Sequence, residues 1–421
     1  MNPVDTKGLL AVILAGGQGE RLYPLTKDRA KPAVPFAGTY RIIDFPLSNC
    51  VNSGLRRIYV LTQYRSISLQ RHINLAWNIF RYDLGEFIGT VPPQLRRANH
   101  WYLGTADAIY QNIYTLEVER PDRVLILSGD HVYKMDYAEM IRAHIDRKAD
   151  LTVACMEVPR EEAHRFGVMQ VDTDFRITAF WEKPADPPAL PGKPDRSLIS
   201  MGIYVFETPV LVRRVVEDSK RDTSHDFGKD IIPAMVGTDR VYAFSFQPPG
   251  GEPPYWRDIG TLDAYWKANM DLIQVVPPFN LYDVRWPIRT YQPQLPPAKT
   301  VFSEDQPGGR VGTALNSLLS CGCIISGGRV ERSVLSPGVR IDAGAVVADS
   351  VVLDNTTIGQ GARIHRAIVD KNVVVPPGMA IGIDHEQDRR LFTVTANGIV
   401  VVPKEAPLTE MVARGHIPVK P

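Results

Sequence analysis

The sequence contains few cysteines and no long hydrophobic run, and both absences exclude classes of protein. Its 421 residues include only four cysteines, Cys50, Cys155, Cys321 and Cys323, whose spacing fits neither a disulfide framework nor a zinc site. No apolar run reaches the roughly 18 residues that a membrane-spanning helix needs. We therefore expect a soluble cytoplasmic protein in a reducing compartment.

The chain also lacks an excess of charge of either sign. Its 48 lysines and arginines nearly balance 47 aspartates and glutamates, which leaves a formal net charge of +1. A near-neutral chain without a basic tract has no overall field that attracts nucleic acid or an anionic membrane. We therefore expect neither as a partner, and any site for an anion must be local.

Strand-like apolar runs alternate with helix-like segments in the first part of the chain. The runs cover residues 9–14, 57–62, 123–127 and 151–157, and the helix-like segments cover residues 67–80, 105–117 and 137–147. Continuous apolar strands that alternate with helices are typical of a parallel sheet covered on both faces. The pattern predicts an α/β fold with a doubly wound, mostly parallel sheet of the Rossmann-like kind.

Two proline-rich stretches interrupt this pattern. Residues 184–194 hold five prolines and are expected to form a loop inside the first domain. The stretch that begins at residue 277 has few helix or strand signals and indicates an interdomain linker. We therefore place a first domain at residues 1–276, the linker at 277–310 and a second domain at 311–421.

The second domain carries an apolar repeat of six residues. Val346, Val352, Ile358 and Ile364 recur at this interval, with glycines beside them. Such a repeat predicts a β-solenoid, in which each short strand forms one wall of a coil. An ordinary β-rich domain with accidental spacing is the alternative.

A glycine-rich loop follows the first apolar run. Gly16, Gly17 and Gly19 lie where backbone N–H groups can approach phosphate oxygens. Their spacing is neither that of a P-loop nor that of a dinucleotide fingerprint. Arg21 just beyond the loop and Lys31 in R-A-K-P supply cations that suit a triphosphate tail, although a plain turn would also explain the glycines.

Motifs along nearly the whole chain resemble one family. They are L-A-G-G-x-G-x-R-L with R-A-K-P-A-V, R-I-I-D-F (41–45), S-N-C-V-N-S-G (48–54), W-Y-x-G-T-A-D-A (101–108), S-G-D-H-V-Y-K-M-D-Y (128–137), W-E-K-P (181–184), S-M-G-I-Y-V-F (200–206), S-H-D-F-G-K-D (224–230) and P-Y-W-R-D-I-G-T (254–261). By these motifs the chain resembles the sugar-phosphate nucleotidyltransferases, and among them the bacterial glucose-1-phosphate adenylyltransferases. The resemblance implies a nucleotidyltransferase domain followed by a left-handed parallel β-helix that serves regulation and oligomerisation.

The implied reaction is the regulated first step of bacterial glycogen synthesis. It transfers the adenylyl group of ATP to α-D-glucose 1-phosphate and gives ADP-glucose and pyrophosphate. The attacking phosphate oxygen is already an anion, because the second pKa of a phosphate monoester is about 6. No general base is needed, so positioning, cations and a metal should carry the catalysis.

The resemblance also assigns residues to roles. The catalytic residues are Arg21, Lys31 and Asp130. Asp130, which follows a predicted buried strand, and Asp258 are the carboxylates for Mg²⁺. ATP is assigned to Gly16, Gly17, Gly19, Gln63, Trp101, Gly104, Thr105 and Ala106. Glucose 1-phosphate is assigned to Tyr102, Gly167, Glu182, Lys183, Ser200, Asp226 and Trp256.

Family members are usually homotetramers under the control of small metabolites, and effector sites need clustered cations. Arg41 matches a family position at the effector site, and the other candidates lie in or just after the predicted solenoid: Arg363, Arg366, Arg389 and Arg390. One position departs from the family pattern, because Asp28 stands where enteric members have the lysine that binds the activator. The neighbouring Lys27 is an alternative cation for that role. A carboxylate repels a bisphosphate, so we expect another activator, such as fructose 6-phosphate or pyruvate.

Two alternatives stay open on the sequence alone. The first is a pyrophosphorylase for another nucleotide sugar, which a comparison of ATP with UTP, dTTP and GTP would separate. The second is a regulatory subunit that binds ligands without turnover. The presence of Arg21, Lys31, Asp130, Lys183 and Asp258 together favours the active enzyme.

Overall fold

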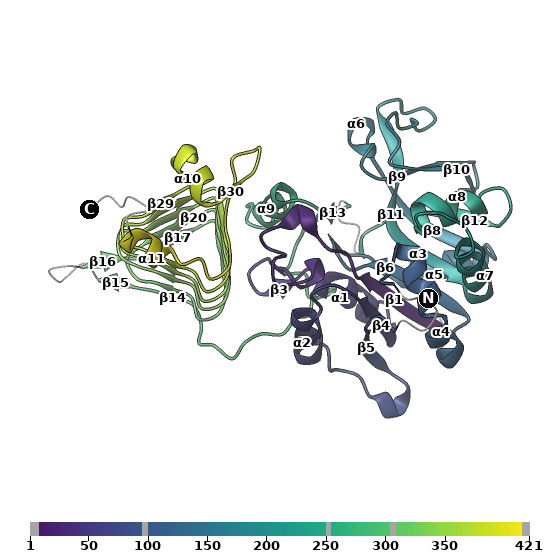
Figure 1. The fold of residues 1–421 in the computed structure, drawn as a ribbon, viewed down its shortest axis with the longest axis horizontal. Helices are drawn as coiled ribbons and strands as arrows, with labels where there is room; N and C mark the ends of the chain where they lie inside the picture. The colour runs from purple at the N-terminus through teal and green to yellow at the C-terminus, as the bar shows by residue number, and fades with distance from the viewer. Residues whose placement is uncertain (1–7, 95–99, 250–253, 304–308, 415–421) are drawn as a thin grey trace.

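The computed structural model describes residues 8–94, 100–249, 254–303 and 309–414 (Figure 1). An α/β domain is joined by an extended segment to a three-sided coil of short strands, the β-helix. Residues 304–308 of the predicted linker, and residues 1–7 and 415–421 of the two predicted domains, lie outside the described residues. Within the described ranges, every helix is too short or too polar to span a bilayer.

The main sheet of the α/β domain is built around β1 (Leu9–Ala15), which is buried along almost its whole length. It runs parallel to β4 (Arg57–Thr62) and β6 (Arg123–Ser128), and β4 runs parallel to β5 (Phe87–Val91). Alternate residues of β1 pack in two different apolar clusters, because successive side chains point to opposite faces of a sheet. The doubly wound arrangement predicted from the apolar runs is therefore confirmed.

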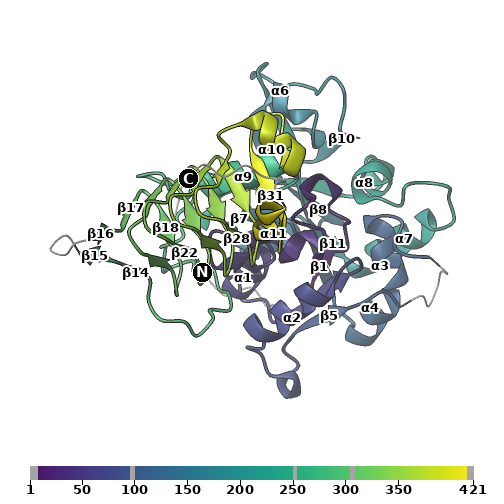
Figure 2. The same cartoon turned by 60° about the vertical axis from the view of Figure 1, so that its left-hand side comes forward.

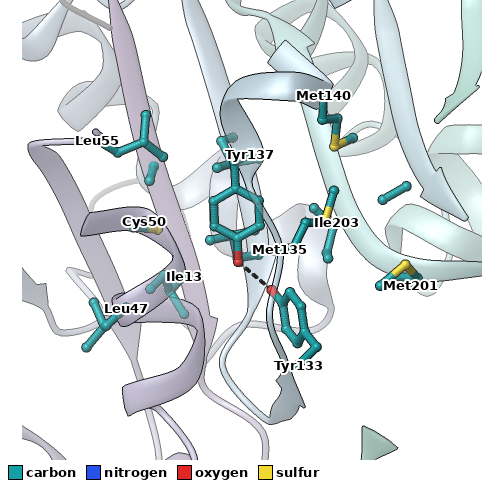
Figure 3. Packing of buried hydrophobic residues seen from close by; sticks show 14 of the residues in the cluster. Ile13, Leu47, Cys50, Leu55, Tyr133, Met135, Tyr137, Met140, Met201 and Ile203 are labelled. Atoms are coloured by element: carbon teal, nitrogen blue, oxygen red, sulfur yellow. Dashed lines mark hydrogen bonds between the residues drawn. The ribbon is translucent and has the colours of Figure 1, made fainter. Parts of the chain in front are cut away.

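Helices cover both faces of this sheet. One face packs against α1 (Asp44–Asn52), α2 (Ile67–Ala76) and α5 (Tyr137–Asp146). The other packs against α3 (Thr105–Gln111), α4 (Ile113–Glu119) and α7 (Thr208–Asp218). On the first face, the hydroxyls of the buried Tyr133 and Tyr137 form a hydrogen bond of 2.5 Å (Figure 3). The two rings lie among Cys50, Met140 and Ile203.

The predicted strand at 151–157 is present as β8 (Leu151–Pro159), but it is not a parallel neighbour of β6. The long strand β11 (Arg196–Glu207) lies between them and runs antiparallel to both. The strand order is β10-β9-β11-β6-β1-β4-β5, with β8 and β12 (Val241–Ser245) branching from β11. The proline-rich loop predicted at 184–194 connects the hairpin of β9 (Gly167–Val171) and β10 (Ile177–Glu182) to β11.

Two of the predicted helices have different bounds. The segment 67–80 stops at Ala76, and the buried Trp77 that follows donates from its indole nitrogen to Asp44 (2.8 Å). The segment 105–117 is broken at Asn112, whose side-chain amide donates to the carbonyl of Ala108 (2.8 Å). A side chain that occupies the carbonyl four residues back competes with the helical hydrogen bond.

Short elements complete the α/β domain. They are η1 (Glu20–Leu22), η2 (Lys31–Ala33), β2 (Pro35–Phe36), β3 (Tyr40–Arg41), η3 (Tyr82–Leu84), β7 (His131–Tyr133), α6 (Arg160–Ala163), the π-helical turn η4 (Phe227–Ile231), α8 (Ile232–Met235), β13 (Trp256–Asp258) and α9 (Leu262–Asp271). The antiparallel pair β7 and β13 stands apart from the main sheet and contributes to the site described below.

Three sheets form the walls of the β-helix, and all are parallel except for the last strand pair of the third sheet, which is antiparallel. The first contains β14 (Lys299–Thr300), β19 (Ile324–Ile325), β22 (Arg340–Ile341), β25 (Thr357–Ile358) and β28 (Val374–Val375). The second contains β17 (Thr313–Leu315), β20 (Arg329–Glu331), β23 (Val346–Ala348), β26 (Arg363–His365) and β29 (Ala380–Ile381). The third contains β18 (Leu318–Leu319), β21 (Val334–Leu335), β24 (Val351–Val352), β27 (Ala367–Val369), β31 (Val400–Val402) and β30 (Thr393–Val394). The hairpin β15 (Phe302–Ser303) and β16 (Arg310–Val311) and the helices α10 (His385–Leu391) and α11 (Leu408–Ala413) flank these walls.

The β-helix is confirmed, but the predicted six-residue frame is partly wrong. Arg340 pairs with Thr357, and Thr357 with Val374, so one coil takes 17 residues and not 18. Two walls of these coils use six residues and the third uses five, whereas the first coil is one residue shorter, with Ile324 paired to Arg340. The inward residue of β23 is therefore Val347, which is fully buried, while the predicted Val346 is only half-buried.

The β-helix packs against the α/β domain near α1 and α9 (Figures 1 and 2). Outward-facing Val334, Val351 and Ile368 join an apolar cluster with Phe36 and Tyr265 of the α/β domain. Polar contacts fix this interface. The indole nitrogen of Trp266 donates to the carbonyl of Asp349 (2.8 Å), and Arg29 pairs with Asp370 at 2.9 Å with both side chains buried.

A buried histidine between α5 and β8 gives a testable pH dependence. His144 Nδ1 lies 2.8 Å from Thr152 Oγ1 and its Nε2 lies 3.3 Å from Glu207 Oε1. Burial, with the charge of Arg123, lowers the pKa of His144 to about 4, although Asp150 opposes the shift. Between pH 4 and 6.5 the unfolded chain binds more protons at this residue, so stability falls as the pH falls through that window.

We expect acidification from pH 6.5 to 4 to cost roughly 3 kcal/mol of unfolding free energy through His144. The measurement is denaturant unfolding as a function of pH for the wild type and His144→Gln. Glutamine does not titrate, so its curve should be flatter by that amount. Parallel curves would show that another group dominates the acid sensitivity.

Candidate active site

Two adjoining cavities open at the carboxyl ends of β1 and β6. The larger, of about 880 Å³, is lined by Gly16, Gly17, Gly19, Gln63 and Thr105 among others, and the smaller, of about 300 Å³, by Gly167, Lys183, Ser200 and Trp256 among others. Residues that line both are Arg21, His131, Glu182, Gly202 and Tyr204. The site is thus one cleft with two compartments, at the edge of the sheet where doubly wound folds bind ligands.

The glycine loop is packed tightly against the segment that carries Lys31. Gly19 has a φ of 67°, a left-handed conformation that favours glycine. A Cβ added there would lie 3.0 Å from Thr26 Cγ2 and 3.1 Å from Lys31 Cβ. The Thr26 hydroxyl also donates to the Gly19 carbonyl (2.9 Å), and η1 follows directly and presents Arg21 to both cavities. Because the loop has glycines in place of larger side chains, its backbone lies close to the side chains of Arg21 and Lys31.

Lys31 bridges the two carboxylates at the meeting point of the compartments. Its Nζ lies 2.6 Å from Asp130 Oδ2 and 3.1 Å from Asp258 Oδ1. Burial would lower the pKa of Lys31, but the charges of Asp130 and Asp258 outweigh it and raise the pKa. Burial would likewise raise the pKa of Asp130, yet the charges of Lys31 and His131 hold it well below its ordinary value. Lys31 and Asp130 are therefore both charged at neutral pH.

The folding of β7 against β13 brings the two carboxylates together. Asp258 is the cross-strand partner of His131, which directly follows Asp130. Asp130, His131 and Asp258 each offer a ligand atom within 4.8 Å of the others. Two carboxylates supply the hard oxygen atoms that Mg²⁺ prefers, so the residues present fit a divalent cation.

The smaller compartment contains the residues assigned to the sugar phosphate. Lys183 has a φ of 50°, which is strained for a residue with a side chain, and its Nζ lies 2.8 Å from Glu182 Oε1. Ser200 Oγ accepts from the N–H of Gly202 (3.2 Å). The Trp256 ring meets His131 edge-on, with 4.8 Å between ring centroids, and its buried indole nitrogen has no partner among the described residues. Tyr102 and Asp226, assigned to the sugar as well, line the larger compartment.

The larger compartment contains most of the residues assigned to the nucleotide. Gln63, Gly104 and Thr105 line it, but Trp101 stands outside, half-exposed and stacked on Tyr64 at 5.2 Å between centroids. Ala106 is buried, and its N–H donates to the carbonyl of His225 (2.8 Å). The Thr105 hydroxyl donates to Asp226 Oδ2 (3.0 Å), so within the larger compartment a residue assigned to the nucleotide contacts one assigned to the sugar.

The five arginines assigned to effectors are not gathered at one place. Arg41 lies at the domain interface, where it donates to the Ala33 carbonyl (2.8 Å) and where burial lowers its pKa despite the charge of Asp354. Arg366 covers the ring of Trp266 at 4.9 Å. The other three are exposed, on β26 and on α10: Arg363, Arg389 and Arg390.

Buried charges surround Arg41 at this interface. Arg29 pairs with Asp370, and Lys371 forms an ion pair with Asp354. Burial, with the charge of Arg41, lowers the pKa of Lys371 to about 8, while Asp354 opposes the shift. Asp28, the departure from the family pattern, is exposed in the segment that precedes Arg29.

The sequence did not identify several residues of the cleft. His131 lies between the compartments, and Gly228 and Gly260 stand against Glu182 and Asp258: a Cβ on Gly260 would lie 2.8 Å from Asp258 Oδ2. They lie within the motifs S-G-D-H, D-F-G-K-D and D-I-G-T. In the sequence, only their closeness to an assigned carboxylate could have pointed to these three residues. That closeness shows a role in the site only when the contacts in the folded structure are known.

Comparisons with known proteins identify the family of each domain. A family model described as nucleotidyl transferase matches residues 10–275, and one described as GlmU-like, C-terminal hexapeptide, matches residues 296–402. The hexapeptide match agrees with the predicted left-handed β-helix. It begins within the stretch predicted as linker.

Several bacterial relatives match over nearly their whole length. Glucose-1-phosphate adenylyltransferase 2 of Vibrio cholerae is 53% identical over 94% of this chain and 97% of its own. The glucose-1-phosphate adenylyltransferase of Rhodopirellula baltica is 54% identical over 93% of this chain and 89% of its own. That of Hydrogenovibrio crunogenus is 53% identical over 94% of each. With its nucleotidyl transferase domain and its hexapeptide β-helix, the chain belongs to the glucose-1-phosphate adenylyltransferase family of enzymes.

Proposed function

We propose that the chain transfers the adenylyl group of ATP to α-D-glucose 1-phosphate, giving ADP-glucose and pyrophosphate in the first step of glycogen synthesis. The observation that carries this proposal is the Lys31 bridge to Asp130 and Asp258 at the junction of the two compartments. A nucleotide in the larger compartment and a sugar phosphate in the smaller would meet there. The names of the relatives supply the identity of both substrates.

The chain's own residues act by positioning and by charge. Backbone N–H groups of the glycine loop and the guanidinium of Arg21 hold the triphosphate. Lys183 at the rim and Glu182 deeper in the cleft hold the phosphate and the hydroxyls of the sugar. An oxygen of the sugar phosphate attacks the α-phosphorus, and the bond to the oxygen that leads to the β-phosphorus breaks as pyrophosphate leaves. Lys31 offsets the negative charge that this approach of two polyanions creates.

Mg²⁺ is the proposed cofactor, held by Asp130 and Asp258. When bound, it neutralises phosphate charge and favours departure of pyrophosphate. In the structure Lys31 supplies positive charge to the same two carboxylates. We therefore expect its ammonium to shift toward the phosphates once the metal and nucleotide bind.

The experiment that tests the function is pyrophosphate release with glucose 1-phosphate, Mg²⁺ and each of ATP, UTP, dTTP and GTP. A strong preference for ATP supports the proposal. A preference for another nucleotide would keep the reaction class and change the pathway. No turnover with any nucleotide or effector would favour the regulatory subunit.

We also propose a homotetramer controlled by small anionic metabolites, with Arg41 and the charges around it as the regulated place. Its position between the two domains supports this, because an anion there would alter how the domains pack. Asp28 argues against fructose 1,6-bisphosphate as the main activator. Light scattering gives the oligomeric state, and assays with fructose 6-phosphate, pyruvate and the bisphosphate, for the wild type and Lys27→Ala, identify the activator. Strong bisphosphate activation that Lys27→Ala removes would contradict this choice.

A further inference from the structure

The carboxylate of Glu182 is enclosed by two glycines from different parts of the chain. Glu182 ends β10 and is the cross-strand partner of Gly167 at the start of β9. On its other side is Gly228, the second residue of η4. A Cβ added to Gly167 would lie 2.9 Å from Glu182 Oε2, and one added to Gly228 would lie 2.5 Å from the same atom. The carboxylate occupies the space that two side chains would otherwise fill.

Glu182 is also held from the rim of the cleft and faces both compartments. Its Oε1 pairs with Lys183 Nζ at 2.8 Å, where Lys183 is mostly exposed. Its Oε2 lies between the glycines. One oxygen therefore pairs with an exposed lysine, and the other faces the backbone of two glycines, so the space left by the glycines lets the carboxylate lie at its present depth in the cleft.

The two glycines differ in what else a methyl group would meet. At Gly167 the Cβ would also lie 2.6 Å from Cζ of Phe180, a buried ring that cannot move aside cheaply. At Gly228 the nearest atoms are Oε2 and Cδ of Glu182, at 2.5 and 3.1 Å, followed by Asp226 Oδ1 at an ordinary 3.4 Å. The φ of Gly228 is outside the left-handed region, so alanine is not strained there. A methyl group at residue 228 would therefore displace the end of one flexible side chain and leave the fold intact.

We propose that Gly228 is a positioning residue for the sugar: its bare backbone lets the Glu182 carboxylate sit at the depth where it accepts hydrogen bonds from the sugar hydroxyls. This inference rests on the proposed function, because it takes Glu182 as a sugar contact. It adds a residue on η4 that acts on substrate only through Glu182. Gly228 and Glu182 line the larger compartment, and Glu182 lines the smaller one as well. Because Glu182 is assigned to the sugar and not to the nucleotide, we expect the main effect on the binding of that substrate.

The test is steady-state kinetics of Gly228→Ala with ATP and glucose 1-phosphate. Misplacing a charged hydrogen-bond acceptor is expected to raise the KM for glucose 1-phosphate by about tenfold to a hundredfold. The KM for ATP should change by less than about threefold, and the Tm should match that of the wild type within a few degrees. Lys229→Ala, on the exposed face of the same turn, is the matched control and should behave as the wild type.

A double-mutant cycle separates this mechanism from a general disturbance. If Gly228 acts through Glu182, then adding Gly228→Ala to Glu182→Ala should raise the KM for glucose 1-phosphate no further. An equal rise in both backgrounds, an unchanged KM in the single variant, or a Gly228→Ala protein that does not fold would each overturn the inference. Wild type that lacks turnover with ATP and glucose 1-phosphate would instead overturn the proposed function, so the two failures are distinguishable.

Discussion

Asp130→Asn is expected to lower kcat by about three to four orders of magnitude while the protein stays folded. The amide keeps the shape of the side chain but loses the charge that pairs with Lys31 at 2.6 Å. It also removes one of the two carboxylates proposed for the metal. Pyrophosphate release at saturating ATP, glucose 1-phosphate and Mg²⁺ measures the loss, and circular dichroism checks the fold.

Asp136→Asn is the matched control for this loss. Asp136 stands in the same motif, but its carboxylate caps α5 by accepting the N–H of Ala138 (2.9 Å). Asparagine caps a helix about as well as aspartate does, so activity and stability should both persist. A loss of activity in Asp136→Asn as large as in Asp130→Asn would indicate a general effect of the motif on folding. Full activity of Asp130→Asn would remove Asp130 from the catalytic site.

The second large effect is expected at the domain interface. Asp370→Ala leaves the guanidinium of Arg29 buried without its partner, and the free energy of unfolding should fall by about 3–5 kcal/mol. Both side chains are almost fully buried, and one Nη of Arg29 already lacks a partner among the described residues. Denaturant unfolding, read by fluorescence and by activity, measures the change. Burial raises the pKa of Asp370 although Arg29 opposes the shift, which agrees with a pair that is costly to desolvate.

Two further variants decide whether the unpaired charge is the cause. Asp342→Ala removes an exposed pair of the β-helix, Arg340 with Asp342 at 2.8 Å, and should cost at most about 1 kcal/mol. Replacing both partners, as Arg29→Met with Asp370→Leu, should recover much of the loss, because no buried charge is left over. If the double replacement is as unstable as Asp370→Ala, the loss comes from packing and not from Arg29.

The position of Asp130 was predictable because only local information was needed. A buried strand followed by an acidic residue places a carboxylate at the carboxyl end of the sheet. Asp258 is different, since it reaches Asp130 only through the pairing of β7 with β13. In this pair Asp258 lies opposite His131, from which it is separated by 127 positions in the sequence. Nothing in the local pattern around residue 258 indicates that pairing, and its role came from family resemblance.

The antiparallel course of β11 and the inward frame of the β-helix show a second limit. An apolar run indicates burial but not direction, so β8 could not be distinguished from a parallel neighbour of β6. A hydrophobic pair such as Val346 and Val347 does not reveal which member points inward until the length of the coil is known. The contact of Gly228 with Glu182 could not be predicted from the sequence either. The need for a glycine at residue 228 is visible only when the structure places the Glu182 carboxylate where a side chain would lie.

The most direct test of the whole account is a crystal structure of the protein with ADP-glucose and Mg²⁺. The account predicts the adenine and ribose in the compartment lined by Gln63 and Thr105, and the glucose against Glu182 in the smaller one. It predicts the metal between Asp130 and Asp258. A product bound outside the joined cavities, or a metal held without Asp130, would contradict it.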